Sequence, residues 1–409
     1  MEQAGFKVYG YRWVVLLAFM FVVAVNQLLW ITFAPITSDA AKYYRVSDLS
    51  IGLLSLSFMV VYIVVSIPAS WVIDTLGMRV AVGIGAALTG VFGLLRGLAA
   101  ADYTWVLIAQ IGIAIGQPFI LNAITKVAAR WFPIRERATA AGLGSLATYL
   151  GILLGLLVTP YLTIGSGIGG MLVIYGIIAA IAAVVFFALA REHPPTPPCP
   201  PEQEARSLVF DGLKQTLRKR DFALLMLVFF VGLGVFNGVT TWIENIVAPR
   251  GFTITDAGII GGLMIVGGVI GALVMPLLSD HYRKRIPFLV LALAGAVVGL
   301  IGITYAESFG LVLAAAFVLG FFLLSAGPIG FQYGAEVAYP APEGTSNGLL
   351  LMMGQISGIV FILAMDSFKS PVTGSMTPSL VVLIGLMALS LLLCTRLGES
   401  ALITQNASR

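Results

Sequence analysis

The sequence predicts an all-α membrane protein in which twelve transmembrane helices form two pseudo-symmetric six-helix bundles. Three observations lead to this fold class: the composition, the lengths of the apolar runs and an internal repeat. Of the 409 residues, 59% are hydrophobic and 10% are charged, whereas about a quarter of the residues in soluble domains are charged. A soluble fold cannot bury that much apolar surface, but lipid accepts it on every side of a helix.

The apolar runs are long enough to cross a bilayer, which takes about 20 residues for roughly 30 Å of hydrocarbon. The first run, Trp13 to Phe33, is too long for the core of a signal peptide, so we interpret it as the first span. The predicted spans of the first half are 13–35, 50–73, 79–99, 104–129, 138–162 and 169–190. Those of the second half are 222–247, 256–278, 287–305, 309–334, 346–366 and 376–396.

The basic residues fix the orientation of these spans. With the N-terminus in the cytoplasm, the outer loops receive only Lys42, Arg45, Arg250 and Lys369, and the cytoplasmic segments receive most of the other lysines and arginines. Because basic loops resist translocation, this asymmetry predicts that both termini are cytoplasmic. We expect a multi-pass protein of the cell membrane, inner or plasma.

The domain organisation follows from a charged, proline-rich segment in the middle of the chain. We predict an N-terminal bundle at 1–190, a cytoplasmic linker at 191–220 and a C-terminal bundle at 221–409. Phe210, Leu213 and Leu217 fall on one helical face of the linker among basic residues. This pattern is typical of a short helix on the membrane surface, and equally of a solvated charged linker.

Two landmarks recur at the same distance along the chain and indicate an internal repeat. Asp74 and Arg79 follow the second span, and Asp280 and Arg285 follow the eighth span, 206 positions later. The segment that begins at Thr139 opens the fifth span, and the one that begins at Thr345 opens the eleventh, again 206 positions later. Duplication of a six-helix unit explains both coincidences.

With the acidic-then-basic loops, the twelve spans and the long central loop, the chain resembles the major facilitator superfamily of secondary transporters. Four segments are similar to the feline leukemia virus subgroup C receptor-related family: 11–16 (YRWVVL), 68–75 (PASWVIDT), 116–121 (GQPFIL) and 343–350 (EGTSNGLL). That family is associated with transport of choline and ethanolamine and with proposed heme export. The short tails, beside the longer termini of eukaryotic members, favour a prokaryotic relative.

The polar groups at mid-depth in the spans are amides and aromatics. They are Asn26 and Trp30 in the first span, Gln117 in the fourth, Tyr149 in the fifth, Asn237 in the seventh and Gln355 in the eleventh. An unpaired amide in hydrocarbon costs on the order of several kcal/mol, so each must face another helix or a wet cavity. For each glutamine, two interpretations stay open: interhelical bonding and contact with a substrate. Trp30 is interpreted as a ligand contact or as a residue of the outer interface belt.

The resemblance implies substrate contact for Gln117, Gln355 and Trp30, whose π-face suits a quaternary ammonium group. The sequence departs from the family at two positions. Asn237 stands where the family has a tyrosine, so an aromatic cage would lose a wall. Phe236, Trp242 and Tyr149 are the candidates to replace it, and choline itself is in doubt. Gln332 stands where relatives carry an acid.

The charged loops resemble the superfamily's cytoplasmic gate. The predicted gating residues are Asp74, Gly77 and Arg79 in the first half, and Asp280, Arg283, Arg285 and Glu336 in the second. An aspartate near a helix N-terminus gains from the helix dipole, and an arginine that pairs with it closes the latch. Glu336 and Glu343 are also candidates to accept salt bridges from Arg130, Arg135 or Arg137. The alternative interpretation is that these charges are topology signals only.

The predicted function is transport of a small organic cation or zwitterion, such as choline, by alternating access. A proton-coupled carrier usually keeps a carboxylate near the midplane, and the spans contain none there, which favours a uniporter or facilitator. The alternatives are a proton- or ion-coupled symporter or exporter of heme, an organic anion or a metabolite, and a receptor without flux.

We find no nucleophile, metal or nucleotide motif, and therefore expect no enzyme activity, no catalytic or metal site and no cofactor. The expected partners are the small solute and the bilayer, without nucleic acid, and the chain is expected to be a monomer.

Overall fold

The computed structural model describes residues 7–198, 217–339 and 343–399, apart from the side chains at 134, 135, 138 and 343–345. Within these ranges every regular element is a helix, and 11 helices are long and apolar enough to cross a membrane. One of them covers Thr139–Leu189 and is 51 residues long. That is about twice the length that a single crossing needs.

This long helix is two helices in series. It belongs to α7 (Ile134–Leu189), which is interrupted at Gly167, where φ is 71° and ψ is 172°. Glycine adopts such a backbone without steric cost. The interruption lies in the predicted loop between the spans 138–162 and 169–190. Counted on its two sides, α7 crosses twice, and the described chain has the twelve predicted spans.

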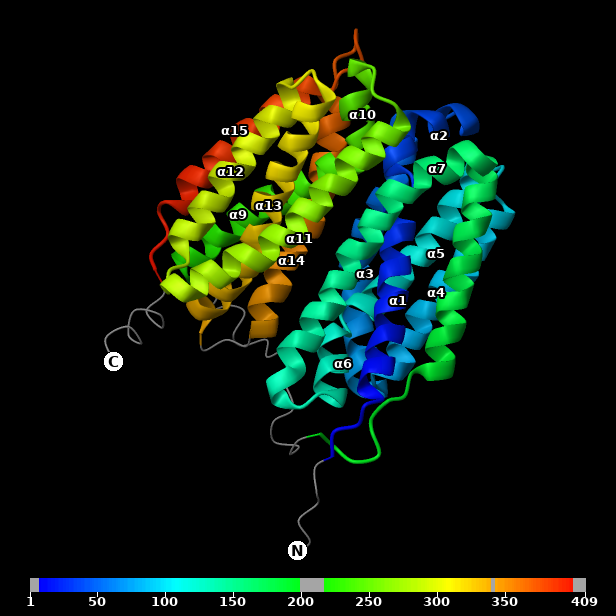
Figure 1. Cartoon of the computed structure of the whole chain (residues 1–409), viewed down its shortest axis with the longest axis vertical. Coiled ribbons are helices and arrows are strands. Elements are labelled where there is room, and N and C mark those ends of the chain that lie inside the picture. The colour runs from blue at the N-terminus through cyan, green and yellow to red at the C-terminus, as the bar shows by residue number, and fades with distance from the viewer. Residues whose placement is uncertain (1–6, 199–216, 340–342, 400–409) are drawn as a thin grey trace, which may run out of the picture. The chain divides into compact units, whose positions relative to one another are not determined.

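The chain divides into two compact units, residues 1–33 with 39–207, and residues 34–38 with 208–409. Within the first unit, α1 and α4 pack against α7, and α5 packs against both α3 and α4. The predicted span 104–129 is two helices, α5 and α6, which meet at Asn122; its amide donates to the hydroxyls of Ser66 and Ser70 on α3. The elements are α1 (Arg12–Ile31), α2 (Thr37–Tyr44), α3 (Asp48–Leu76), α4 (Met78–Leu98), α5 (Tyr103–Leu121), α6 (Ile124–Trp131) and α7 (Figure 1).

In the second unit, α11 and α13 pack most closely. A Cβ added at Gly320 would overlap the Met264 carbonyl oxygen, and one added at Gly271 would overlap that of Phe321, so only glycine permits this approach. The predicted linker helix falls mostly outside the described residues. The elements are α9 (Arg220–Thr241), α10 (Ile243–Val247), η3 (Ala248–Arg250), α11 (Ile254–Tyr282), α12 (Ile286–Tyr305), α13 (Phe309–Ala338), α14 (Glu343–Ser367) and α15 (Thr377–Cys394).

A short segment that follows α1 packs with the second unit. It covers Ala34–Ser38 and contains the 3-10 turn η1 (Ala34–Ile36). The backbone N and the hydroxyl of Ser38 donate to Glu244 Oε2 at 3.1 and 2.9 Å. Ser38 and Glu244 are 206 positions apart, so this contact joins equivalent positions of the repeat.

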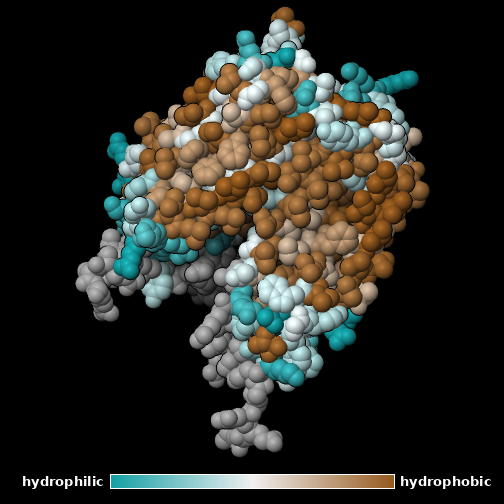
Figure 2. All heavy atoms as spheres, in the orientation of Figure 1, coloured by the Kyte–Doolittle hydropathy of each residue, from teal (hydrophilic) through white to brown (hydrophobic). Residues whose placement is uncertain are grey.

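The outer surface of each unit is apolar, as a lipid environment requires. Figure 2 shows hydrophobic side chains over the middle of each unit and hydrophilic side chains gathered toward the helix ends. Large apolar side chains stand exposed on the helices, among them Val64 and Leu98 in the first unit and Leu277 and Leu392 in the second. Such surface is stable in contact with acyl chains and unstable in water.

Equivalent helix ends in the two units are capped in equivalent ways. Glu192, just after α7, accepts hydrogen bonds from the backbone N of Met78 and Arg79 at 3.1 and 2.7 Å. Glu399, just after α15, accepts from the backbone N of Arg285 and Ile286 at 3.0 Å each. The two carboxylates are 207 positions apart. Each satisfies N–H groups that have no partner within their own helix and gains from the helix dipole.

We expect Glu399→Gln and Glu192→Gln each to lower the stability of the folded protein by about 1 kcal/mol, because the charge at a helix N-terminus is lost while an acceptor remains. Thermal unfolding of the purified protein in detergent measures the change. The control is Glu307→Gln, since Glu307 is exposed and has no polar partner among the described residues. An unfolding temperature that falls equally in all three variants would contradict the capping role.

Candidate functional site

Trp30 lies inside the first unit, where its indole and its backbone carbonyl group are both hydrogen-bonded to Ser55. Only 5% of its surface is exposed. Its indole Nε1 donates to the Ser55 carbonyl oxygen on α3 at 3.2 Å, and the Ser55 hydroxyl donates to the Trp30 carbonyl oxygen at 3.4 Å. Since residues of an interface belt lie at the membrane surface, this burial argues against the belt interpretation.

Asn26, one turn earlier in α1, is fully buried and bonded at both ends of its amide. Its Nδ2 donates to Thr89 Oγ1 at 3.1 Å and to the Ile113 carbonyl oxygen at 3.5 Å. Its Oδ1 accepts from Gln27 Nε2 at 3.3 Å. The side chain therefore connects α1 to α4 and α5. This is the interhelical role that amides play in membrane bundles, and ligand contact by Asn26 stays a prediction.

Gln117 differs from Asn26 although it is almost as deeply buried, with 6% of its surface exposed. Its carboxamide has no hydrogen-bond partner among the described residues, and neither the oxygen nor the nitrogen of this group is fully buried. It precedes Pro118, which interrupts the backbone bonding of α5. An amide so placed in an apolar helix is available to a ligand or to water.

In the second unit, the candidate residues lie on α9 and α14, which pack against each other. Asn237 Nδ2 donates to the Gly354 carbonyl oxygen at 3.2 Å, so it is bonded to the residue before Gln355. Gln355 is half-buried, and within the described ranges its carboxamide has no partner. Phe236 is buried with 9% of its surface exposed. Tyr149, on α7 of the first unit, is half-buried.

Four of these candidates occupy equivalent positions of the repeat. Trp30 and Phe236 are 206 positions apart, and so are Tyr149 and Gln355. The first pair lies on α1 and α9, and the second pair on α7 and α14. The 206-position offset of the landmark aspartates, Asp74 and Asp280, contains the information needed to predict this register from the sequence.

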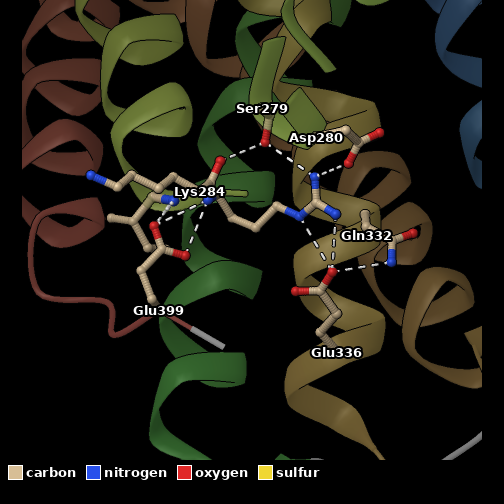
Figure 3. A network of polar contacts seen from close by, with 8 residues as sticks. Ser279, Asp280, Lys284, Gln332, Glu336 and Glu399 are labelled. Carbon is tan, nitrogen blue, oxygen red and sulfur yellow. Dashed lines mark hydrogen bonds and ion pairs between the residues drawn. The ribbon is translucent and has the colours of Figure 1, made fainter. Parts of the chain in front are cut away.

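Three of the predicted gating residues of the second unit, Asp280, Arg285 and Glu336, form an ion-pair network (Figure 3), in which Arg285 and Glu336 are buried and Asp280 is exposed. The side chains of Arg285 and Glu336 have exposed fractions of 10% and 8%. Arg285 Nη2 and Nε donate to Glu336 Oε1 at 3.2 and 3.3 Å, and Nη1 donates to Asp280 Oδ1 and, at 3.1 Å, to Ser279 Oγ. Arg285 thereby links α13 to the end of α11.

Two further residues of this region have defined positions. Gln332 Nε2 donates to Glu336 Oε1 at 3.1 Å, one turn away on α13. An acid at position 332 would repel Glu336, so the departure from the family suits the local pairing. Arg283 ends α11 with a left-handed backbone, φ 53°. The predicted pairing of Glu343 or Arg135 falls on side chains outside the described residues.

In the first unit, the predicted pair of Asp74 with Arg79 is wrong. Asp74 pairs with Lys126 of α6 instead, at 3.6 Å between Nζ and Oδ1. Arg79 lies in the first turn of α4, where its backbone N is bonded to Glu192 and its side chain is exposed. Gly77 has φ 89°, and a Cβ there would overlap the Glu192 carboxylate. The backbone therefore turns at Gly77 in a way that needs glycine.

The comparisons with known proteins agree with this architecture. The model of the Major Facilitator Superfamily matches residues 16–362. Solute carrier family 49 member A3 of Xenopus tropicalis is 32% identical over 388 residues, which cover 90% of this chain and 80% of that protein. Choline/ethanolamine transporter FLVCR1 of Mus musculus is 29% identical over 404 residues, with 89% and 72% covered.

Solved structures show the same fold. A bacterial homolog of the human lysosomal transporter Spinster, in an inward-facing and unoccupied conformation, superposes with a TM-score of 0.77 at 18% identity, and 96% of this chain and 98% of that chain are covered. The transporter FucP, in the outward conformation, gives a TM-score of 0.66 at 17% identity, with 95% and 98% covered. The chain therefore belongs to the Major Facilitator Superfamily of membrane transporters, as a relative of Solute carrier family 49 member A3 and of the choline/ethanolamine transporters, and it is not an enzyme.

Proposed function

We propose that this transporter carries a small organic cation or zwitterion, with choline as the first candidate, by alternating access. The observation that supports this most is the state of Gln117 and Gln355. Both are carboxamides in apolar helices, and neither has a hydrogen-bond partner among the described residues. Bonding by a ligand with hydroxyl or carbonyl groups removes the cost of leaving such amides unbonded.

The aromatic residues support a cationic group on that ligand. Trp30 is the strongest aromatic partner for a quaternary ammonium, at about 1 to 2 kcal/mol when desolvated. Asn237, which replaces the family's tyrosine, is bonded to the Gly354 carbonyl oxygen and does not supply a wall. Phe236 is the repeat equivalent of Trp30, and we assign the second aromatic wall to it. The names of relatives such as Choline/ethanolamine transporter FLVCR1 favour the same substrate class.

The distribution of charge favours a facilitator. Asp74, Asp280 and Glu336 lie at helix ends in the ion pairs described above. Glu244 lies on the short helix α10 and accepts two hydrogen bonds from Ser38. In the proposal no midplane carboxylate binds a coupling proton. We also propose a monomer in the cell membrane with both termini cytoplasmic, which the sorting of basic residues between loops supports.

Uptake of radiolabelled choline into proteoliposomes tests the substrate and the site. The wild-type protein is expected to give saturable uptake, and Gln117→Ala and Gln355→Ala are each expected to raise the half-saturating concentration about tenfold, the equivalent of one lost hydrogen bond. Asn122→Ala is the control, because this half-buried amide is bonded to Ser66 and Ser70; it should lower stability and leave half-saturation unchanged. Absence of saturable uptake, together with no thermal stabilisation by choline, would favour a receptor or another solute.

The coupling mechanism is tested with imposed gradients. A uniporter of a permanent cation responds to the membrane potential, so an inside-negative potential of about 60 mV should raise choline accumulation about tenfold. A pH gradient clamped at zero potential should have no effect. Accumulation driven by the pH gradient alone would instead establish the proton-coupled alternative.

We further propose that Arg285, Asp280 and Glu336 form the cytoplasmic gate of the second unit. Glu336→Gln leaves the buried guanidinium with one charge fewer to pair with, and we expect a stability loss of about 1 to 3 kcal/mol and slower transport with choline binding retained. Asp74→Asn is the matched change in the first unit. The Asp74 side chain is 45% exposed, so its loss should cost less than about 1 kcal/mol. Equal thermal shifts for the two variants, with unchanged transport, would reject the gate.

A further inference from the structure

The end of α1 is held by side chains from two other helices, directly beside Trp30. The last carbonyl groups of a helix have no partner within it. The Leu29 carbonyl oxygen accepts from Arg96 Nη1 at 3.1 Å and from Gln110 Nε2 at 3.2 Å. It also accepts from Thr32 Oγ1 at 3.2 Å. The peptide that leads into Trp30 is therefore fixed by donors on α4 and α5.

Arg96 is unusual because it is fully buried without an acidic partner. None of its surface is exposed. Its Nη1 also donates to Gln110 Oε1 at 2.7 Å, its Nη2 donates to Thr32 Oγ1 at 3.4 Å, and its guanidinium carbon lies 5.7 Å from the centre of the Phe33 ring. No carboxylate pairs with it among the described residues, and its Nε has no hydrogen-bond partner.

Burying a guanidinium without a carboxylate costs several kcal/mol, although the negative ends of α1 and α4 offset part of this. A neutral amide or hydroxyl can cap a helix end at lower cost. Because this cost is avoidable, a buried charge in a membrane span indicates a functional role. The function that the contacts indicate is control of the peptide before Trp30.

We propose that Arg96, together with Gln110, is a positioning residue that sets Trp30 for ligand contact. Ser55 bonds the indole and the carbonyl group of Trp30, and Arg96 bonds the carbonyl group of the preceding peptide. The backbone and the ring of Trp30 are therefore both held in position. The part of the proposal that concerns the ligand rests on the proposed function. The part that concerns the position of Trp30 does not, and it is measured without ligand.

The second unit offers a matched control. Arg250 makes the same kind of contacts, although it is half-buried and Arg96 is fully buried: its Nη1 donates to the Ile303 and Ala306 carbonyl oxygens at 2.8 and 2.7 Å, and its guanidinium carbon lies 5.9 Å from the centre of the Phe252 ring. It caps the end of α12 and has no contact with a candidate ligand residue among its described bonds. Arg250→Gln therefore reports the purely structural effect of removing such an arginine.

The experiment is fluorine NMR of the full-length protein labelled with 5-fluorotryptophan. The six tryptophans give six resonances, and Trp30→Phe identifies that of Trp30. Arg96→Gln is expected to move or broaden the Trp30 resonance, and Arg250→Gln is expected to leave it unchanged. Gln110→Glu keeps an acceptor for Arg96 but removes one donor to Leu29, so it should move the Trp30 resonance in the same direction by less. If Arg96→Gln does not fold, the resonance of Trp30 in Gln110→Glu provides the test.

Choline uptake completes the test. Arg96→Gln should raise the half-saturating concentration about tenfold, and the change should largely vanish in a Trp30→Phe background. An unchanged Trp30 resonance in Arg96→Gln and Gln110→Glu would overturn the proposal, as would fully additive effects of Arg96→Gln and Trp30→Phe. Should the wild-type protein not transport choline, the proposed function fails and the resonance of Trp30 still decides the positioning role.

Discussion

Helix ends leave backbone N–H and carbonyl groups without partners, and polar side chains within a bilayer find no water to bond, so the described contacts of this chain are organised by the need to satisfy both kinds of group. Helix N-termini are closed by carboxylates, Glu192 and Glu399, which come from the segment after the last helix of each unit. Helix C-termini are closed by cations, Arg96, Arg250 and Lys219, which donate to terminal carbonyl groups. Both choices follow the sign of the helix dipole. The same contacts that satisfy the backbone thereby fix where each helix begins and ends.

Against this background, an amide without a partner is informative. Asn26, Gln110 and Asn122 are each bonded within the first unit, and each connects two or more helices. Gln117 and Gln355 are not bonded in this way among the described residues, although they lie in equally apolar helices. An apolar residue at either position would avoid the cost of an unbonded carboxamide, so folding alone does not require these glutamines. In the proposed function, a polar ligand bonds both carboxamides for part of the transport cycle.

Local features of the sequence predict the helices well and their contacts poorly. Span positions follow from hydropathy, since the apolar requirement acts on each residue separately; the predicted span 309–334 corresponds to α13 at Phe309–Ala338. The end of α1 was predicted at residue 35 but lies at Ile31, because the apolar run continues past the point where Arg96 and Gln110 close the helix. The pair of Asp74 with Lys126 is likewise not predicted, because it depends on a partner from another helix. Partners that are distant in sequence leave no mark on hydropathy or on local spacing.

The repeat separates what both halves need from what only one half needs. Positions 30 and 236 are both aromatic, as Trp30 and Phe236, so an aromatic ring at this position is common to the two units. Tyr149 and Gln355 differ in hydrogen-bonding capacity, since a phenol has one donor hydrogen and an acceptor oxygen, and a carboxamide has two donor hydrogens and an acceptor oxygen. The position equivalent to Arg96 is Gly302, 206 positions later, so the buried charge belongs to the first half alone. In the proposal, Arg96 acts in the half that carries the tryptophan, because a tryptophan ring binds cations more strongly than a phenylalanine ring.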